Sequence, residues 1–296
     1  MTEPNTFTGG GLDRVAERRG DDAWLAAQTA DPGARAVLAG DGGVLVTADG
    51  EPRLALVPLA SVDGGGEPLL LGLDGAGPVF AVEAGTAPGA RPLGLREAAA
   101  SLPRADAGLA AHAVALLNWH RRHPRCSVCG AHTAAGEGGI VRRCPNCGAE
   151  HHPRTDPVVI MLVTDGADRV LLGRQPSWPG GRFSALAGFV EPGESLEEAV
   201  VREVREEAGV EVGPPVYVSS QPWPFPTSLM LGFLAPYRAG DPHRVDQELE
   251  DVRWFERAVL EEAVAGDEHR LGVPPRLAIA RRLMEHWLES TRPGAA

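Results

Sequence analysis

The chain has 296 residues, 43% hydrophobic and 23% charged, a balance typical of a globular protein with about two domains. Its formal net charge of -12 argues against a broad electrostatic grip on nucleic acid, although contact with one RNA end stays open. The N-terminus has no basic start or apolar run, and no stretch approaches the roughly 20 apolar residues that span a bilayer. We therefore expect a cytoplasmic protein without membrane contact, in which paired cysteines are metal ligands before they are disulfides.

The first part of the chain reads as a β-rich domain. Residues 1 to about 35 are polar and glycine-rich, and we expect a mobile start. Apolar residues at helical spacing predict a helix within residues 95–120. Short apolar runs between turn residues predict strands at 44–46, 54–57 and 69–71. We assign residues 1–120 to an N-terminal β-rich domain with a linking helix, whose function the sequence does not reveal.

All four cysteines fall into one pattern, in which Cys126-x2-Cys129 is followed after fourteen residues by Cys144-x2-Cys147. Two such turns can complete a tetrahedral zinc shell, and a glycine after each pair suits their backbone. Four protein ligands leave no open coordination position, so we expect one structural zinc per chain in a ribbon over residues 121–154. Nearby arginines keep RNA contact by this ribbon open, and a solvated basic face is the alternative.

Residues 155–296 read as a second α/β unit. A strongly helical segment covers residues 196–208, and a last helix is expected at about 276–288, after two prolines. The predicted strands are residues 158–163, 170–172, 216–218 and 230–234.

The segment 196–208 carries three glutamates on one helical face. Glu203, Glu206 and Glu207 are spaced i, i+3, i+4. Like charges at this spacing repel unless a cation lies between them, and clustered carboxylates suit Mg²⁺ or Mn²⁺. Ser195 and Glu198 are spaced as a capping box at the start of this helix. An ordinary solvated acidic face remains the alternative on the glutamates alone.

Residues Gly188 to Val210 resemble the Nudix box, G-x5-E-x7-R-E-U-x-E-E-x-G-U, at every specified position. The resemblance implies an α/β Nudix fold, with a mixed sheet sandwiched by helices. It implies that Glu203, Glu206 and Glu207 are catalytic ligands of two or three Mg²⁺ or Mn²⁺ ions, joined by the carbonyl of Ala187. Glu194 would support the loop, and Arg202 would pair with a glutamate of the box.

Two further features resemble the NADH pyrophosphatase family within the Nudix hydrolases: the zinc ribbon directly upstream, and a loop matching SQPWPFPxS. Prolines hold such a loop extended, and its Trp and Phe faces can each stack on a base, contributing about 1–3 kcal/mol. The alternative is a structural loop whose aromatics pack into the core. The expected substrate contacts of this loop are Gln221, Pro222, Trp223, Pro224, Phe225, Pro226, Thr227 and Ser228.

Other positions carry over from the family with less sequence context. Glu248 resembles a distal metal-binding glutamate, with Glu250 as the competing choice. The family usually has tyrosine where this chain has His152, which puts a tyrosine hydroxyl contact to substrate in doubt. The remaining substrate contacts implied by the resemblance are Arg96, Glu137, Phe189 and Ala280.

The resemblance implies hydrolysis of NAD⁺ or NADH to nicotinamide mononucleotide and AMP by metal-activated water. It also implies a homodimer with residues of both chains near the site. Removal of a 5′ NAD cap from RNA cuts the same bond and can coexist with this activity. The alternatives are a hydrolase of ADP-ribose or other nucleoside diphosphates, and a non-catalytic zinc-ribbon module that binds RNA.

Overall fold

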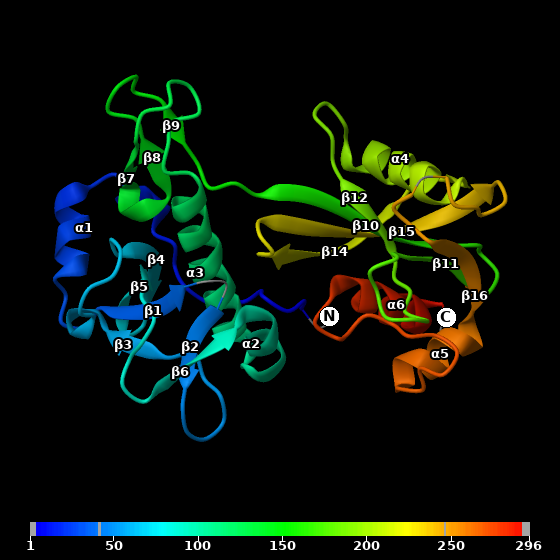
Figure 1. The fold of residues 1–296 in the computed structure, drawn as a ribbon, viewed down its shortest axis with the longest axis horizontal. Helices are drawn as coiled ribbons and strands as arrows, with labels where there is room; N and C mark the ends of the chain where they lie inside the picture. The colour runs from blue at the N-terminus through cyan, green and yellow to red at the C-terminus, as the bar shows by residue number, and fades with distance from the viewer. Residues whose placement is uncertain (1–3, 41–42, 246, 292–296) are drawn as a thin grey trace.

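The computed structural model describes residues 4–40, 43–245 and 247–291. Two lobes lie side by side, and a small ribbon sits against the first of them (Figure 1). The segment that leads from the ribbon into the second lobe passes over the space between the lobes (Figure 1). No helix of the described residues combines the length and the apolar character needed to cross a membrane.

The first lobe is a six-stranded sheet with β4-β5-β1-β2-β6 in spatial order and β3 paired to β1. Strands β1 and β5 run parallel, and the other pairs are antiparallel. The expected strands are present as β2, β3 and β4. The element bounds are η1 (Ala16–Arg18), α1 (Asp22–Thr29), β1 (Arg35–Gly40), β2 (Gly43–Thr47), β3 (Leu56–Pro58), η2 (Leu59–Ser61), β4 (Leu69–Asp74), β5 (Gly77–Glu83) and β6 (Ala90–Gly94).

The helix expected within 95–120 is two helices, α2 (Leu95–Ser101) and α3 (Arg104–Arg122). Pro103 precedes α3 and forces the residue before it, Leu102, into an extended conformation, so one continuous helix is excluded. Helix α3 buries its apolar face in the core of the first lobe.

The ribbon is a three-stranded antiparallel sheet in the order β7-β8-β9. Its strands are short because the residues around each cysteine pair form a turn and are not part of a strand. The bounds are β7 (Ala134–Gly136), η3 (Glu137–Gly139), β8 (Val141–Arg143) and β9 (Glu150–His151).

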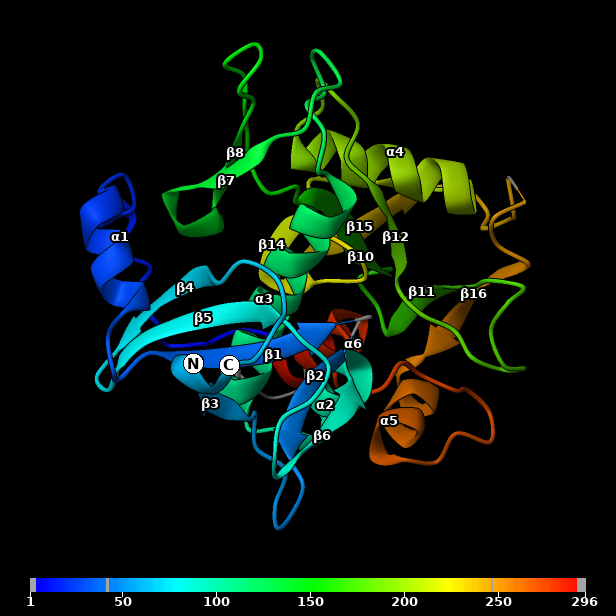
Figure 2. The same ribbon diagram turned by 60° about the vertical axis from the view of Figure 1, so that its left-hand side comes forward.

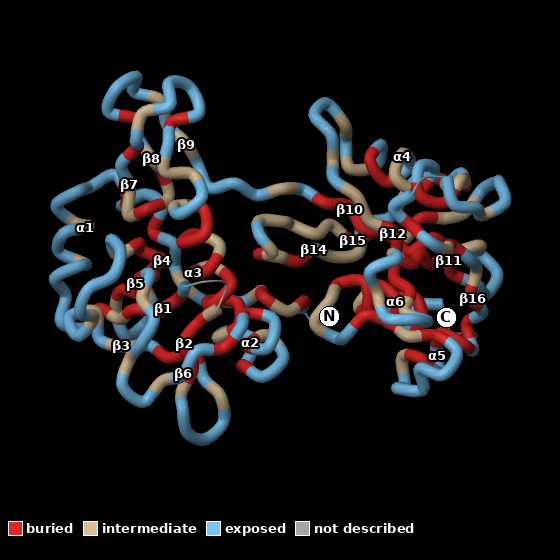
Figure 3. The backbone as a smooth tube through the Cα atoms, viewed as in Figure 1, coloured by how far each residue is buried: buried red, intermediate tan, exposed pale blue. Residues whose placement is uncertain are grey.

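The second lobe is a seven-stranded mixed sheet in the order β13-β15-β10-β11-β16, with β12 on β10 and β14 on β15. The central pair β10 and β15 is parallel, and the other pairs are antiparallel. Strand β10 is buried along most of its length (Figure 3). The bounds are β10 (Asp156–Thr164), β11 (Arg169–Arg174), β12 (Leu186–Phe189), α4 (Leu196–Ala208), β13 (Glu211–Val212), β14 (Val216–Trp223), β15 (Ser228–Ala239), β16 (Asp251–Glu256), α5 (Arg257–Ala265) and α6 (Ile279–Ser290).

Helices cover both faces of this sheet. Helix α4 packs on one face, and α5 and α6 pack on the other, each over its own apolar cluster. Figure 2 gives the same arrangement from a second direction, with α4 on one side of β10 and β15 and α6 on the other. The predicted fold, a mixed sheet between helices behind a β-rich N-terminal domain and a ribbon, is thereby confirmed.

Helix α6 begins at Ile279, three residues after the start expected from its prolines. The side-chain oxygen of Gln221 accepts a hydrogen bond from the Ile279 N–H at 2.8 Å. The first turn of a helix leaves N–H groups without partners inside the helix, so such an acceptor fixes where a helix can start. The start of α6 is therefore set by a residue 58 positions earlier in the chain.

Candidate active site and metal centre

Helix α4 is held by local interactions that orient its acidic face. Ser195 Oγ accepts from the Glu198 N–H at 3.2 Å, and the Glu198 carboxylate accepts from the Ser195 N–H at 2.8 Å, completing the capping box. Gly209 ends the helix at a φ of 67°, a left-handed conformation that glycine adopts without strain. Val200 and Val204 are fully buried beneath the helix, so the opposite face carries the glutamates outward.

Arg202 lies at the centre of the acidic face. Its guanidinium donates to Glu194 at 2.6 Å, to Glu203 at 2.8 Å and to Glu206 at 3.0 Å. The bond from Arg202 lowers the pKa of Glu194 to about 2. Burial raises the pKa of Glu203 in spite of Arg202, and the charges of Glu206 and Glu248 raise it further. One arginine thus leaves negative charge uncompensated here, which is the condition that favours cation binding.

Two backbone features bring the carboxylates to the strand end. Glu207 is 3% exposed, and its carboxylate accepts from the Ala187 N–H at 3.2 Å. The Glu203 carboxylate lies over Gly188, where an added Cβ would stand 1.9 Å from its carboxyl carbon. Position 188 therefore requires glycine because the Glu203 carboxylate lies so close to the backbone there, and not because of an unusual φ. Ala187 and the carboxylates of Glu203 and Glu207 therefore lie close together at β12, and their role as metal ligands stays a prediction.

The structure distinguishes between the two candidates for a distal metal ligand. Glu250 forms an ion pair with Arg174, and its N–H donates to the Arg174 carbonyl at 2.8 Å. Arg174 also donates to the Trp178 carbonyl at 2.9 Å, so Glu250 belongs to a structural network. Glu248 is exposed, and its charge acts on Glu203. This geometry favours Glu248, whose role as a ligand stays a prediction.

A cavity of about 350 Å³ opens directly beside Glu207. Trp178 contributes aromatic surface from the loop after β11, and Trp223 contributes it from the end of β14. Apolar walls with few polar groups are typical of pockets that hold a planar ligand. The predicted site residues that line this cavity are Ala187, Glu207, Gln221, Trp223 and Ala280.

Gln221 has a different role from the substrate hydrogen bond that we expected. It is 1% exposed, and its amide N–H groups donate to the carbonyls of Thr6 at 3.2 Å and Leu277 at 2.8 Å. Its oxygen accepts from Ile279. Both amide hydrogens are used by main chain, so Gln221 ties β14 to the N-terminal segment and to α6. Its side chain thereby holds together the segments that form this part of the cavity wall.

The aromatic loop packs against the first lobe. Phe7 is 3% exposed, and its ring lies 6.1 Å from that of Trp223 and 5.9 Å from that of Phe225. The Arg96 guanidinium lies over both of the latter rings, 4.2 Å from the Phe225 centroid and 5.2 Å from that of Trp223. This supports the structural alternative for Phe225, and Trp223 belongs both to this cluster and to the cavity wall. It also brings Arg96 beside the loop.

The packing of Phe7 changes the expectation for the chain start. Asn5 donates to Ser219 Oγ at 3.0 Å and to the Ser220 carbonyl at 2.8 Å. Gly108 of α3 leaves room for this segment, because an added Cβ would stand 2.9 Å from the Thr8 carbonyl oxygen. Residues 5–8 therefore run between the lobes and contact both, contrary to the mobile start that composition suggested.

Several predicted contacts lie away from the cavity in the single chain. Phe189 is 60% exposed, and His152 is exposed on the segment that follows the ribbon. Glu137 lies in the ribbon and forms an ion pair with Arg143. Thr227 donates to Asp156 at 2.6 Å. Phe189, His152 and Glu137 do not line the cavity beside Glu207 in the single chain, and their contacts with substrate stay predictions that depend on the expected homodimer.

Gln175 and Trp178, in the loop after β11, are among the pocket residues that lie outside the expected motifs. A tryptophan flanked by proline and glycine in this loop was the sequence signal for them. Thr6 and Phe7 gave no such signal, because their importance comes only from contacts made more than 200 residues away.

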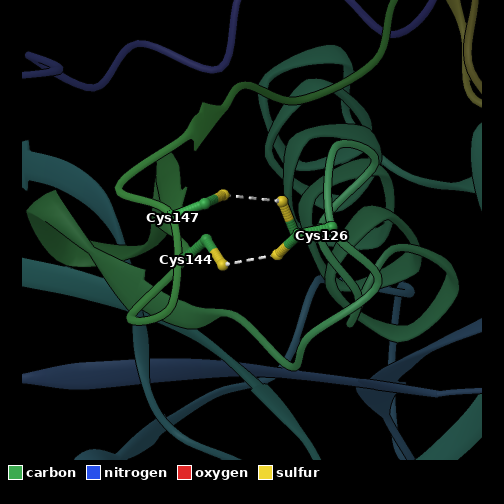
Figure 4. Close-up of side chains that lie close together, drawn as sticks. Cys126, Cys144 and Cys147 are labelled. Atoms are coloured by element: carbon green, nitrogen blue, oxygen red, sulfur yellow. Dashed lines mark hydrogen bonds between the residues drawn. The ribbon is translucent and has the colours of Figure 1, made fainter.

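The four cysteines meet in the ribbon, and their sulfur atoms all lie within 4.8 Å of one another. The sulfurs of Cys126 and Cys147 are 3.6 Å apart, and those of Cys129 and Cys144 are 3.5 Å apart (Figure 4). Tetrahedral zinc with bonds of about 2.3 Å separates its sulfurs by about 3.8 Å, so the cluster fits zinc. The Asn146 amide lowers the pKa of Cys129 to about 6, which favours the thiolate. The ribbon is a structural zinc site.

Three family models match consecutive parts of the chain. Residues 33–119 match the NADH pyrophosphatase-like rudimentary NUDIX domain, and residues 121–151 match the NADH pyrophosphatase zinc ribbon domain. Residues 154–273 match the NUDIX domain. The first lobe, for which the sequence suggested no role, is therefore a rudimentary relative of the second.

Curated relatives share this organisation over most of the chain. The NAD-capped RNA hydrolase NudC of Stutzerimonas stutzeri (strain A1501) is 43% identical over 256 residues, covering 85% of this chain and 86% of the relative. The protein of that name from Deinococcus radiodurans is 42% identical, covering 76% and 78%. The NAD-capped RNA hydrolase NUDT12 of Macaca fascicularis is 47% identical over 63% of this chain, which spans only 43% of that relative. The chain belongs to the NADH pyrophosphatase family of Nudix hydrolases.

Proposed function

We propose that this hydrolase cleaves the pyrophosphate of NAD⁺ or NADH to nicotinamide mononucleotide and AMP, and that it also removes 5′ NAD caps from RNA. The observation that carries the proposal is the single cavity in which the Nudix glutamate Glu207 and the aromatic surfaces of Trp178 and Trp223 meet. A planar ring held there places its attached phosphates toward the carboxylate face. The names of the relatives support the extension to capped RNA.

Divalent cations fit the residues at the end of β12. The carboxylates of Glu203, Glu206 and Glu207 are hard oxygen ligands. Burial, and then the charges of Glu206 and Glu248, raise the pKa of Glu203 although Arg202 acts to lower it. We propose Mg²⁺ or Mn²⁺ there, with Glu248 and the Ala187 carbonyl as further ligands. Such ions polarise phosphoryl oxygens and generate hydroxide near neutral pH.

The chain's own residues then hold the reactants. Hydrogen bonds from Arg202 orient the carboxylates of Glu203 and Glu206, and the hydrogen bond from the Ala187 N–H orients that of Glu207. The walls from Trp178 and Trp223 exclude water from the ring and orient it. A carboxylate beside a bound water is suited to accept a proton from it, and Glu203, Glu206 or Glu207 would take this role.

We also propose that the active form is a cytoplasmic homodimer. The exposed Phe189 and His152 do not line the cavity of their own chain, and a partner subunit would bring such residues to the neighbouring site. Size-exclusion chromatography with light scattering tests the dimer directly. A monomer that retains full activity would contradict it.

The function is tested by hydrolysis of NADH, NAD⁺, ADP-ribose and NAD-capped RNA side by side with Mg²⁺ or Mn²⁺. We expect the mononucleotide and AMP from NAD(H), and loss of activity in Glu207→Gln. Glu197→Gln is the matched control, because Glu197 is exposed in the first turn of the same helix. Cleavage of ADP-ribose alone would refute the NAD(H) assignment, and no cleavage by zinc-loaded protein would favour a binding module.

A further inference from the structure

A second hollow, of about 610 Å³, lies between the lobes. It is lined by the first described residues of the chain, by the start of α3 and by the start of α6. Three arginines from separate segments line it: Arg104 of α3, Arg276 of the loop before α6, and Arg282 of α6. We call this hollow the arginine groove.

The arginine groove carries a net positive charge on an acidic protein. Among the described residues, none of its three guanidinium groups has an ion pair or hydrogen-bond partner. Two acidic residues also line it, of which Glu285 is paired with Arg281 at 2.8 Å and Glu289 is exposed. With Glu285 neutralised by Arg281, the three arginines outnumber the remaining glutamate, so the groove is locally positive in a chain of net charge -12. Arginines without carboxylate partners are available to bind an external anion.

The arginine groove shares a wall with the catalytic cavity. Pro274 and Ala278 line the cavity, and Arg276 between them lines the groove. Thr6 lines the groove, and its carbonyl accepts the hydrogen bond from Gln221, which lines the cavity. One layer of chain thus separates the two spaces. A ligand that occupies both spaces would have to cross only this layer.

We propose that the arginine groove binds the phosphodiester backbone of the nucleotides that follow an NAD cap, a role that rests on the proposed function. Arginine presents a planar fork of donors that fits phosphate oxygens, and phosphate contacts position a nucleic acid without reading its sequence. Cations spread over three segments fit successive phosphates better than one isolated anion. Free NAD(H) has no nucleotides beyond its adenosine, so it offers no further phosphodiester for the groove to bind.

The test compares two substrates in one variant. Arg104→Gln, Arg276→Gln and Arg282→Gln are combined, and Arg91→Gln, Arg238→Gln and Arg244→Gln form the charge-matched control. These control arginines are exposed, outside the groove, and without a side-chain partner among the described residues. We expect KM for NAD-capped single-stranded RNA to rise at least about tenfold in the groove variant, while kcat/KM for NADH stays within twofold of wild type. The control should leave both unchanged.

Binding gives an independent readout. Fluorescence anisotropy of an uncapped 5′-monophosphate RNA oligonucleotide on Glu207→Gln protein measures log Kd against log salt. Loss of three phosphate contacts should reduce that slope by about 2, since each contact contributes about 0.7 for single strands. Equal slopes in the groove and control variants would overturn the proposal, as would an equal loss of NADH and capped-RNA hydrolysis. If wild-type protein fails to cleave NADH, the proposed function fails while the anisotropy result still decides the groove.

Discussion

Replacing Gln221 by alanine distinguishes a structural role from a substrate contact. The change removes three buried hydrogen bonds, to the Thr6 carbonyl, the Leu277 carbonyl and the Ile279 N–H. A buried group left without a partner costs about 1–3 kcal/mol, and water entering the space recovers part of it. We therefore expect a loss of about 2–4 kcal/mol in the free energy of unfolding.

Differential scanning fluorimetry should record this loss as a melting temperature lower by roughly 5–10 °C. The kcat for NADH should fall as well, because the cavity wall loses the hydrogen bond that joins β14 to the start of α6. Gln175→Ala is the matched control, since Gln175 lines the same cavity and makes no side-chain hydrogen bond to a described residue. An unchanged melting temperature with a raised KM alone would refute the structural role and restore Gln221 as a substrate contact.

Three further predictions concern the metal sites. Gly188→Ala would place a Cβ 1.9 Å from the Glu203 carboxyl carbon and so displace this carboxylate. We expect at least about a hundredfold loss of kcat, with the zinc content unchanged. A kcat near that of wild type would contradict this prediction. Arg202 lowers the pKa of Glu194 to about 2. The contribution of Glu194 to stability is therefore complete above its ordinary pKa and is lost as the pH falls toward 2. The melting temperatures of wild type and Glu194→Gln should differ at pH 7 and converge near pH 2. Cys144→Ser should abolish the one zinc per chain seen by elemental analysis and lower the melting temperature, and full zinc retention would refute the four-thiolate site.

Local physical chemistry let the sequence predict much of the second lobe. The capping box at Ser195, the stripe of Val200 and Val204, and Gly209 determine both ends and the buried face of α4 without any distant partner. The cysteine spacing likewise predicts the zinc cluster, because each knuckle is a short-range turn and only one pairing of knuckles is available. Those elements match because every interaction that defines them spans a few residues.

Long-range packing decided what the motifs left open. The sequence favoured Glu248 and left Glu250 as a competing choice, and the ion pair of Glu250 with Arg174 is a long-range contact that speaks for Glu248. The Pro-rich loop suggested free aromatic faces, yet Phe7 and Arg96, from the first lobe, cover Phe225. No periodicity or spacing in the sequence records such contacts, since they depend on how two separately folded sheets meet.

The sequence by itself determined the chemistry of the site: which carboxylates share a helical face, which thiolates form a cluster, and which family supplies the pattern. The tertiary structure decided which of those groups line one cavity, and it showed that the chain start and α6 complete its wall through Gln221. The reason is physical: side-chain chemistry and helix caps are local properties, whereas a cavity exists only between elements that the fold brings together.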